Sequence, residues 1–106
     1  MIRLTPAPAL AALLCLASLA AEARPARCTT SEEGSYACDF EPVGRDGSFR
    51  ISASGKPTYA IDVVEPGIAA ASVSFGARSI PLPGRYVRQQ SGCWINFDNR
   101  SRICAQ

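Results

Sequence analysis

Residues 49–75 read FRISASGKPTYAIDVVEPGIAAASVSF, and this stretch decides the fold class. Apolar residues alternate with polar or small ones in three short segments: 49–54, 59–64 and 71–75. Gly55-Lys56-Pro57 and Glu65-Pro66-Gly67 separate the segments and have the composition of turns. Alternation with a period of two is typical of strands that bury one face of a sheet. The stretch therefore predicts consecutive antiparallel strands.

The spacing of glycine extends this pattern over the chain. Apart from the close pair Gly44 and Gly47, the eight glycines lie eight to twelve residues apart, which is the turn spacing of small all-β domains. Two prolines in residues 80–84 remove two ladder donors, so this segment is expected to be an exposed edge or a crossover. We predict one all-β domain, a small antiparallel β-sandwich or barrel-like domain of about five to seven strands.

The N-terminal residues have the pattern of a secretory signal peptide. Arg3 supplies the positive charge, residues 9–21 are apolar except for Ser18, and Ala21-Glu22-Ala23 fits a cleavage site. Cleavage leaves residues 24–106 as the single small β-domain, 106 − 23 = 83 residues long. The expected location is periplasmic or secreted. Because the apolar run is too short to span a bilayer, no stable membrane insertion is expected after cleavage.

Removal of this leader also removes Cys15 and leaves Cys28, Cys38, Cys93 and Cys104. An even number of cysteines in a short exported chain predicts two disulfides that stabilise a small core. Zinc sites usually contain closely spaced cysteine pairs, which are absent from this sequence.

Turn chemistry favours local pairing of these cysteines. A three-residue loop, Glu32-Glu33-Gly34, places Cys28 opposite Cys38, and a two-residue turn at Asp98-Asn99 places Cys93 opposite Cys104. Four cysteines allow three connectivities, so a link between the two ends of the chain remains open.

Catalysis is not expected. The sequence contains no histidine, which excludes His-dependent triads and His metal sites. Asp39 and Glu41 would share one face of a strand at a separation that glycosidase pairs use, but scattered surface carboxylates produce such a pair by chance and a domain this small rarely has the cleft that a site needs. The same acids with Asp46 lack the spacing of a calcium loop. We predict no enzyme activity, cofactor or metal.

A binding face is predicted in the C-terminal half. Residues 24–65 carry five basic and seven acidic groups (5 − 7 = −2), whereas residues 66–106 carry five Arg and one Asp (5 − 1 = +4). This asymmetry favours an acidic protein partner, and the excess is too small to indicate nucleic acid. The candidate binding residues combine aromatic surface with forked donors: Trp94, Tyr86, Arg78, Arg85 and Arg88.

Trp94 has two possible roles in this prediction. Alternation places Cys93, Ile95 and Phe97 on one face of a strand and Trp94 on the other, more polar face. An exposed tryptophan there is either a binding anchor or a lid over a disulfide and the arginine stems.

Ser74-Phe75-Gly76-Ala77-Arg78, with Tyr36-Ala37-Cys38 before it and Cys93-Trp94 after it, resembles a pattern in bacterial inhibitors of C-type lysozyme. The resemblance covers a handful of positions. It implies a small exported β-barrel that inserts loops into an enzyme cleft. The sequence departs from that pattern because Phe75 interrupts the Ser-Gly-Ala stretch and the Cys93–Cys104 unit has no counterpart.

The sequence thus predicts an exported, non-catalytic binding or interaction module of the bacterial envelope or extracellular space. The first alternative is an inhibitor of a secreted hydrolase, either lysozyme- or protease-inhibitor-like. A small hydrolase and a structural envelope protein without a dedicated ligand are the other two hypotheses.

Overall fold

A computed structural model describes residues 23–106, so the predicted leader lies outside the described residues except for Ala23. The described chain is all β, with nine strands: β1 (Arg24–Thr30), β2 (Gly34–Val43), β3 (Ser48–Ser52), β4 (Thr58–Glu65), β5 (Ile68–Phe75), β6 (Arg78–Pro81), β7 (Tyr86–Arg88), β8 (Cys93–Asn96) and β9 (Arg102–Ala105). Every pairing between them is antiparallel.

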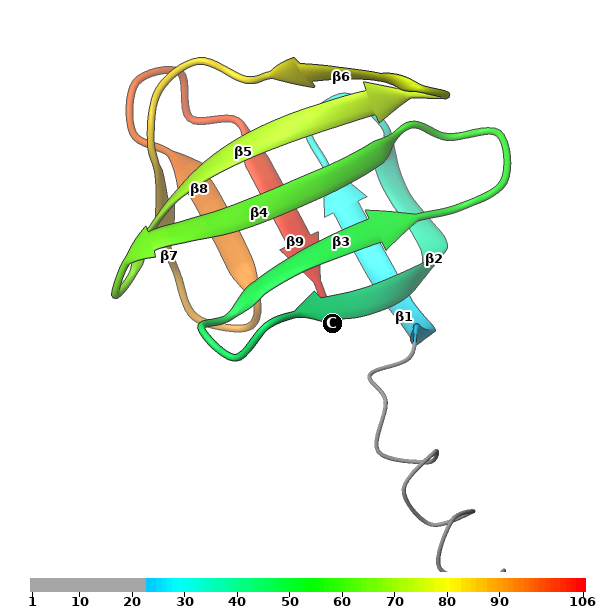
Figure 1. Ribbon diagram of the computed structural model, residues 1–106, viewed down its shortest axis with the longest axis horizontal. Helices are drawn as coiled ribbons and strands as arrows, with labels where there is room; N and C mark the ends of the chain where they lie inside the picture. The colour runs from blue at the N-terminus through cyan, green and yellow to red at the C-terminus, as the bar shows by residue number, and fades with distance from the viewer. Residues whose placement is uncertain (1–22) are drawn as a thin grey trace, which may run out of the picture.

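The strands close into an eight-stranded barrel (Figure 1). Strands that follow one another in sequence pair with each other, except β6 and β7, and β9 returns to pair with β1, so the sheet closes on itself. Strands β6 and β7 both pair with β5, β6 near its end and β7 near its start, and together they occupy one position in the barrel wall. The barrel form of the predicted fold is therefore confirmed, with more strands than the five to seven expected.

The barrel interior is filled by one alternating set of side chains. Six predicted inward residues of three strands are buried: Phe49 and Ile51 on β3, Tyr59 and Ile61 on β4, and Ala71 and Val73 on β5. Phe75, predicted on the same face as Ala71 and Val73, is 55% exposed because it lies at the end of β5. All eight glycines have positive φ, consistent with their predicted positions in turns. The four residues of β6 are exposed, as expected for the segment that contains the prolines.

The barrel has two open ends. Both termini of the described chain lie at one of them, here called the terminal end, with loops 44–47, 66–67 and 89–92 (lower part of Figure 1). Loops 31–33, 53–57, 76–77 and 97–101 lie at the other, here called the opposite end.

The two local disulfides are both formed, Cys28–Cys38 and Cys93–Cys104. The predicted facing of Cys93 and Cys104 is confirmed by their register. The predicted facing of Cys28 and Cys38 is wrong by two residues, because Cys28 pairs with Tyr36.

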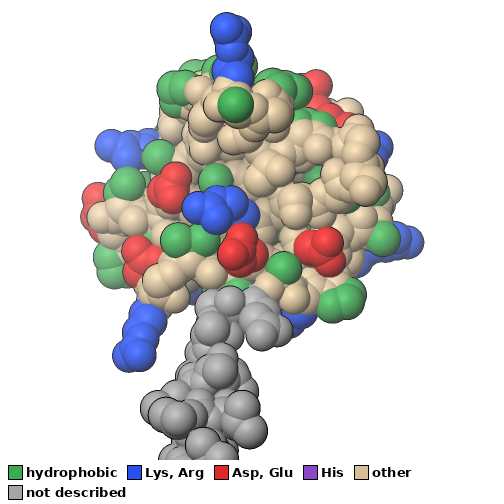
Figure 2. Space-filling model, turned by 45° about the vertical axis from the view of Figure 1, so that its right-hand side comes forward, with side chains coloured by type: hydrophobic (Ala, Val, Ile, Leu, Met, Phe, Trp, Pro, Cys, Tyr) green, Lys and Arg blue, Asp and Glu red, His purple; other side chains and the backbone are tan. Residues whose placement is uncertain are grey.

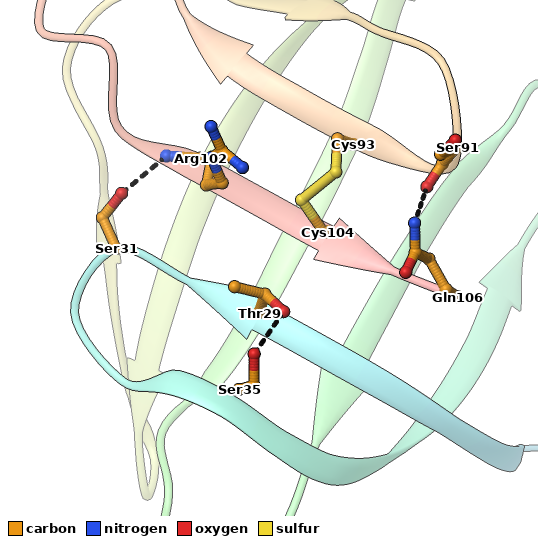
Figure 3. Close-up of a disulfide and its surroundings, with 8 residues drawn as sticks. All are labelled: Thr29, Ser31, Ser35, Ser91, Cys93, Arg102, Cys104 and Gln106. Atoms are coloured by element: carbon orange, nitrogen blue, oxygen red, sulfur yellow. Dashed lines mark hydrogen bonds between the residues drawn. A yellow bond between two sulfur atoms is a disulfide. The ribbon is translucent and has the colours of Figure 1, made fainter.

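The shift in the first hairpin has a visible cause in the neighbouring strand. Ser31 N donates to Arg102 O (3.2 Å), and Arg102 N donates to Ser31 Oγ (2.9 Å; Figure 3). These bonds extend the β1–β9 pairing beyond the end of β1. The loop therefore consists of residues 31–33, and Thr30 pairs with Gly34.

Strand β8 faces the opposite way from its predicted orientation. Trp94 and Asn96 point into the barrel and are 5% and 1% exposed, whereas Phe97 is 75% exposed. Tyr86, predicted to lie beside an exposed Trp94, is also buried. The prediction of an exposed tryptophan on this strand is wrong, because Asn96 is a buried polar residue that the alternation assigned to the surface.

Candidate functional site

The predicted binding residues do not form one surface. Arg88 and Trp94 are paired across β7 and β8 and both line a pocket at the terminal end. Tyr86 lines a pocket at the opposite end, Arg85 lies on the outer wall, and Arg78 begins the exposed strand β6. The structure therefore joins two of the five residues and separates the other three.

The outer wall of the barrel carries an apolar row that includes Ile95, which the alternation had placed on the face opposite Trp94. Ile68 pairs with Val87, and Val87 pairs with Ile95, so the three side chains lie side by side on β5, β7 and β8. Each is half-buried and alternates with an inward neighbour, which places it on the outside. Phe97 follows directly after β8, lines the same shallow pocket as Ile68 and Val87, and is largely exposed. These four residues are called the outer patch.

Charged side chains flank the outer patch. Arg85 and Phe97 line a shallow pocket of about 410 Å³ on this wall, together with Glu65 and Asp98. Phe97 N donates to Arg85 O at 2.9 Å, which fixes the start of the β8–β9 loop beside this arginine. Figure 2 shows that, on the face it presents, acidic and basic side chains are interspersed with small apolar groups.

The pocket at the terminal end has a volume of about 630 Å³. Three aromatic side chains line it, Phe40, Phe49 and Trp94, and the first two are stacked with ring centroids 5.0 Å apart. Its charged lining residues are Asp46, Glu65 and Arg88. Apolar walls with a few polar groups are typical of small-ligand sites.

Asp46 is held in a defined orientation at this pocket. Its Oδ1 accepts a hydrogen bond from Ser48 N at 3.0 Å. Hydrogen bonds from Ser48 hold the pKa of the Asp46 carboxyl below its usual value.

The pocket at the opposite end has a volume of about 470 Å³ and is lined by Tyr59, Tyr86 and Glu33 among others. Desolvation raises the pKa of Tyr59, and the nearby carboxylates Glu33 and Glu32 raise it further. Desolvation also raises the pKa of Tyr36, whose buried hydroxyl has no hydrogen-bond partner among the described residues. Tyrosine ionisation is therefore disfavoured at this end.

The carboxylate pair considered for hydrolysis lies outside these pockets. Asp39 is exposed on β2, and Glu41 Oε1 accepts a hydrogen bond from Arg50 Nη1 at 3.4 Å. Residues 23–106 contain no cluster of three or more potential metal-ligating Cys, Asp or Glu side chains. Within the same range, no helix has the length and apolar character needed to cross a membrane.

The chain matches no protein family, no curated protein and no solved structure. The residues that carry the resemblance to lysozyme inhibitors lie in three separate parts of the barrel. These are β2 at Tyr36, the β5–β6 turn around Gly76 and β8 at Trp94. The barrel agrees with the fold that the resemblance implies.

Sequence reasoning missed the outer patch and both pockets. Residues 93–97 read CWINF, in which only Asn96 is strongly polar, so alternation could be assigned in either direction. The size of tryptophan was a usable signal, because the largest apolar side chain gains most from burial in the barrel. The pockets combine strand and loop residues from distant parts of the sequence, so no local sequence pattern predicts them.

Proposed function

We propose that this domain is an exported, non-catalytic binding module that contacts a protein partner through the outer patch. The observation that carries the proposal is the row Ile68–Val87–Ile95 with Phe97 projecting beside it. A row of apolar side chains on the outside of a closed barrel has no role in the core. Exposed apolar groups rimmed by charges are typical of protein interaction surfaces.

Two arginines beside the patch favour contact with acidic groups of a partner, and Glu65 and Asp98 on the same wall oppose them. Arg85 lines the same shallow pocket as Phe97, and Arg102 pairs with Ile95 across β8 and β9. Arginine at an interface rim supplies forked donors to carboxylates and speeds association at low salt. Phe97 supplies rigid apolar area that a partner pocket can bury.

The location forms part of the same proposal. Two intramolecular disulfides are consistent with an oxidising environment, such as the periplasm or the extracellular space. We propose export through the leader at residues 1–23, which places the partner in the bacterial envelope or outside the cell.

The proposal is tested by capture of partners from envelope and extracellular fractions on immobilised protein. The matched pair is Phe97→Ser and Phe75→Ser, which alter two exposed phenylalanines at different positions (75% and 55% exposed). We expect Phe97→Ser to abolish capture of a partner that the natural protein and Phe75→Ser both retain. Equal capture by the natural protein and both variants would show that the partner does not bind through Phe97 and the outer patch.

Inhibition of a secreted hydrolase is the second candidate function, and the β5–β6 hairpin favours it. Phe75 is exposed at the end of β5, Arg78 follows across the turn, and all of β6 is exposed. A projecting hairpin has the shape needed to enter an enzyme cleft. Inhibition assays on secreted lysozymes and proteases test it, with Phe75→Ser expected to reduce inhibition and Phe97→Ser expected to leave it unchanged.

A further inference from the structure

The pocket at the terminal end lies apart from the β5–β6 hairpin and shares only Glu65 with the shallow pocket beside the outer patch. It opens between Asp46 and Gly92, which lie in loops, and Glu65 at the end of β4, and its walls are Phe40, Phe49 and Trp94. From these residues we infer a second binding site, which takes a small organic cation with an attached apolar group, such as an alkylated ammonium.

The aromatic walls suit such a ligand. The faces of Trp and Phe rings carry negative electrostatic potential and attract cations, alkylated ammonium groups included. Phe40 already has a cation over its ring, because the Arg24 guanidinium carbon lies 4.8 Å from the ring centroid, so a bound cation would compete with Arg24 at this wall. The apolar part of the ligand would pack against Trp94, the chain's single tryptophan, which is 5% exposed.

The charges at the pocket favour the same class. Two carboxylates, Asp46 and Glu65, line it together with one guanidinium, Arg88, so the lining has an excess of one negative charge. The ion pairs among residues 23–106 lie elsewhere, at Arg50–Glu41 and Lys56–Glu33. The carboxylates are therefore available to balance a bound cation, whereas Arg88 opposes it.

The opposing roles of these charges give variants with effects of opposite sign. Glu65→Gln removes an attractive charge and should weaken binding of a cation about threefold, as for a partly exposed ion pair. Arg88→Gln removes a repulsive charge and should strengthen binding by a similar factor. Glu32→Gln, at the opposite end of the barrel, is the matched control and should change nothing.

The experiment uses protein recovered from expression of the full-length chain and three probes that share a benzyl group. Benzyltrimethylammonium is the cation, benzyl alcohol the neutral probe and phenylacetate the anion. Trp94 fluorescence reports occupancy of the pocket, and calorimetry measures affinity. For ligands of this size we expect a Kd on the order of 1 mM for the cation and at least about fivefold weaker binding of the other two.

Three outcomes would overturn the inference. Phenylacetate binding more tightly than benzyltrimethylammonium would assign the pocket to anions. Weaker binding of the cation to the Arg88→Gln variant would show that Arg88 does not oppose the bound ligand, and would also contradict a cation site. Failure of all three probes to change fluorescence or heat at concentrations of about 20 mM, well above the expected Kd, would show that the pocket is not a ligand site.

Discussion

The two disulfide-bridged hairpins enclose loops of similar size, yet their sulfur atoms lie on opposite sides of the barrel wall. Cys28 and Cys38 are separated by 10 residues, and Cys93 and Cys104 by 11. The first bridge lies inside the barrel, where Cys28 is fully buried. The second lies on the outer face, because the alternating neighbours Trp94 and Ile103 belong to the core (Figure 3). Cys104 is only 4% exposed, but it lies outside the core cluster that contains Cys28 and Cys38.

This difference separates two ways in which a disulfide stabilises a fold. Each bridge restricts the unfolded chain by about the same amount, roughly 3 kcal/mol for loops of this length. Only the inner bridge also fills core volume between β1 and β2. The outer bridge adds a brace between β8 and β9, beside the Ser91–Gln106 and Thr29–Ser35 hydrogen bonds (Figure 3).

The largest expected effect comes from deleting the inner bridge. The double variant Cys28→Ala/Cys38→Ala should lose about 4–5 kcal/mol of unfolding free energy, since it loses both the chain restriction and buried sulfur. Cys93→Ala/Cys104→Ala should lose about 3 kcal/mol. Urea unfolding followed by circular dichroism measures both. Equal losses, or a larger loss for the outer bridge, would contradict a separate packing contribution.

The two faces of β8 extend the same comparison to single side chains. Trp94→Ala should cost about 3–4 kcal/mol, because it leaves a large cavity in the barrel. Ile95→Ala, on the outer face of the same strand, should cost about 1 kcal/mol, since Ile95 is only half-buried. Thermal and urea unfolding of the two variants test this. A larger loss for Ile95→Ala would restore the orientation expected from the sequence.

Local pattern was sufficient where one face of a strand is clearly polar. Phe49, Ile51, Tyr59 and Ile61 alternate with polar or small residues and were assigned correctly to the core. Strand β8 has apolar residues on both faces, so its orientation depends on which neighbours it meets. In a closed barrel the interior is set by all the strands together, and single-strand alternation does not contain that information.

The turns of the two hairpins also differ in how they are held. Asn96 is 1% exposed, and its Nδ2 donates to Pro83 O at 2.8 Å. Its Oδ1 accepts from Asp98 N (2.8 Å) and Asn99 N (3.0 Å). The β1–β2 turn has one comparable bond, from Glu33 N to Thr30 Oγ1 at 2.9 Å.

Removing these side chains should therefore give unequal losses. Asn96→Ala should cost about 2–3 kcal/mol, because it removes a fully buried side chain together with three part-buried hydrogen bonds to the backbone, and Thr30→Ala about 1 kcal/mol. Chemical unfolding of both variants provides the measurement. The prediction fails if Asn96→Ala is the milder substitution.

The candidate site was less predictable than the fold. Arg85, predicted as a binding residue, is exposed, whereas Phe97 was assigned to the same face as the core residues and is 75% exposed. The terminal-end pocket combines side chains from β2, β4 and β8, which are distant in sequence and adjacent only after the barrel closes. No spacing rule connects such residues.

Alkaline pH should destabilise the barrel through two buried tyrosines, Tyr36 on β2 and Tyr59 on β4. Burial raises the pKa values of Tyr36 and Tyr59 above their ordinary value near 10. Their contribution to stability is complete below pH 10 and is lost as pH rises through the raised pKa values, because ionisation is easier in the unfolded chain. Melting curves from pH 8 to about pH 11.5, with tyrosine absorbance, measure the loss. Tyr36→Phe should reduce this pH dependence, and tyrosine titration at the ordinary pKa would contradict it.

The smallest expected effect on stability belongs to Phe97, on the outer side of the second hairpin. Its side chain is 75% exposed, so Phe97→Ala should change the free energy of unfolding by less than about 0.5 kcal/mol. The same substitution should remove at least about 2 kcal/mol of affinity for a captured partner, as expected for an aromatic residue central to an interface. Trp94→Ala is expected to have the opposite effects: it should lower the free energy of unfolding and leave the affinity for the captured partner largely unchanged. Unfolding curves and partner titrations on the two variants measure both quantities. If Phe97→Ala destabilises the fold and leaves affinity unchanged, the outer patch serves packing rather than binding.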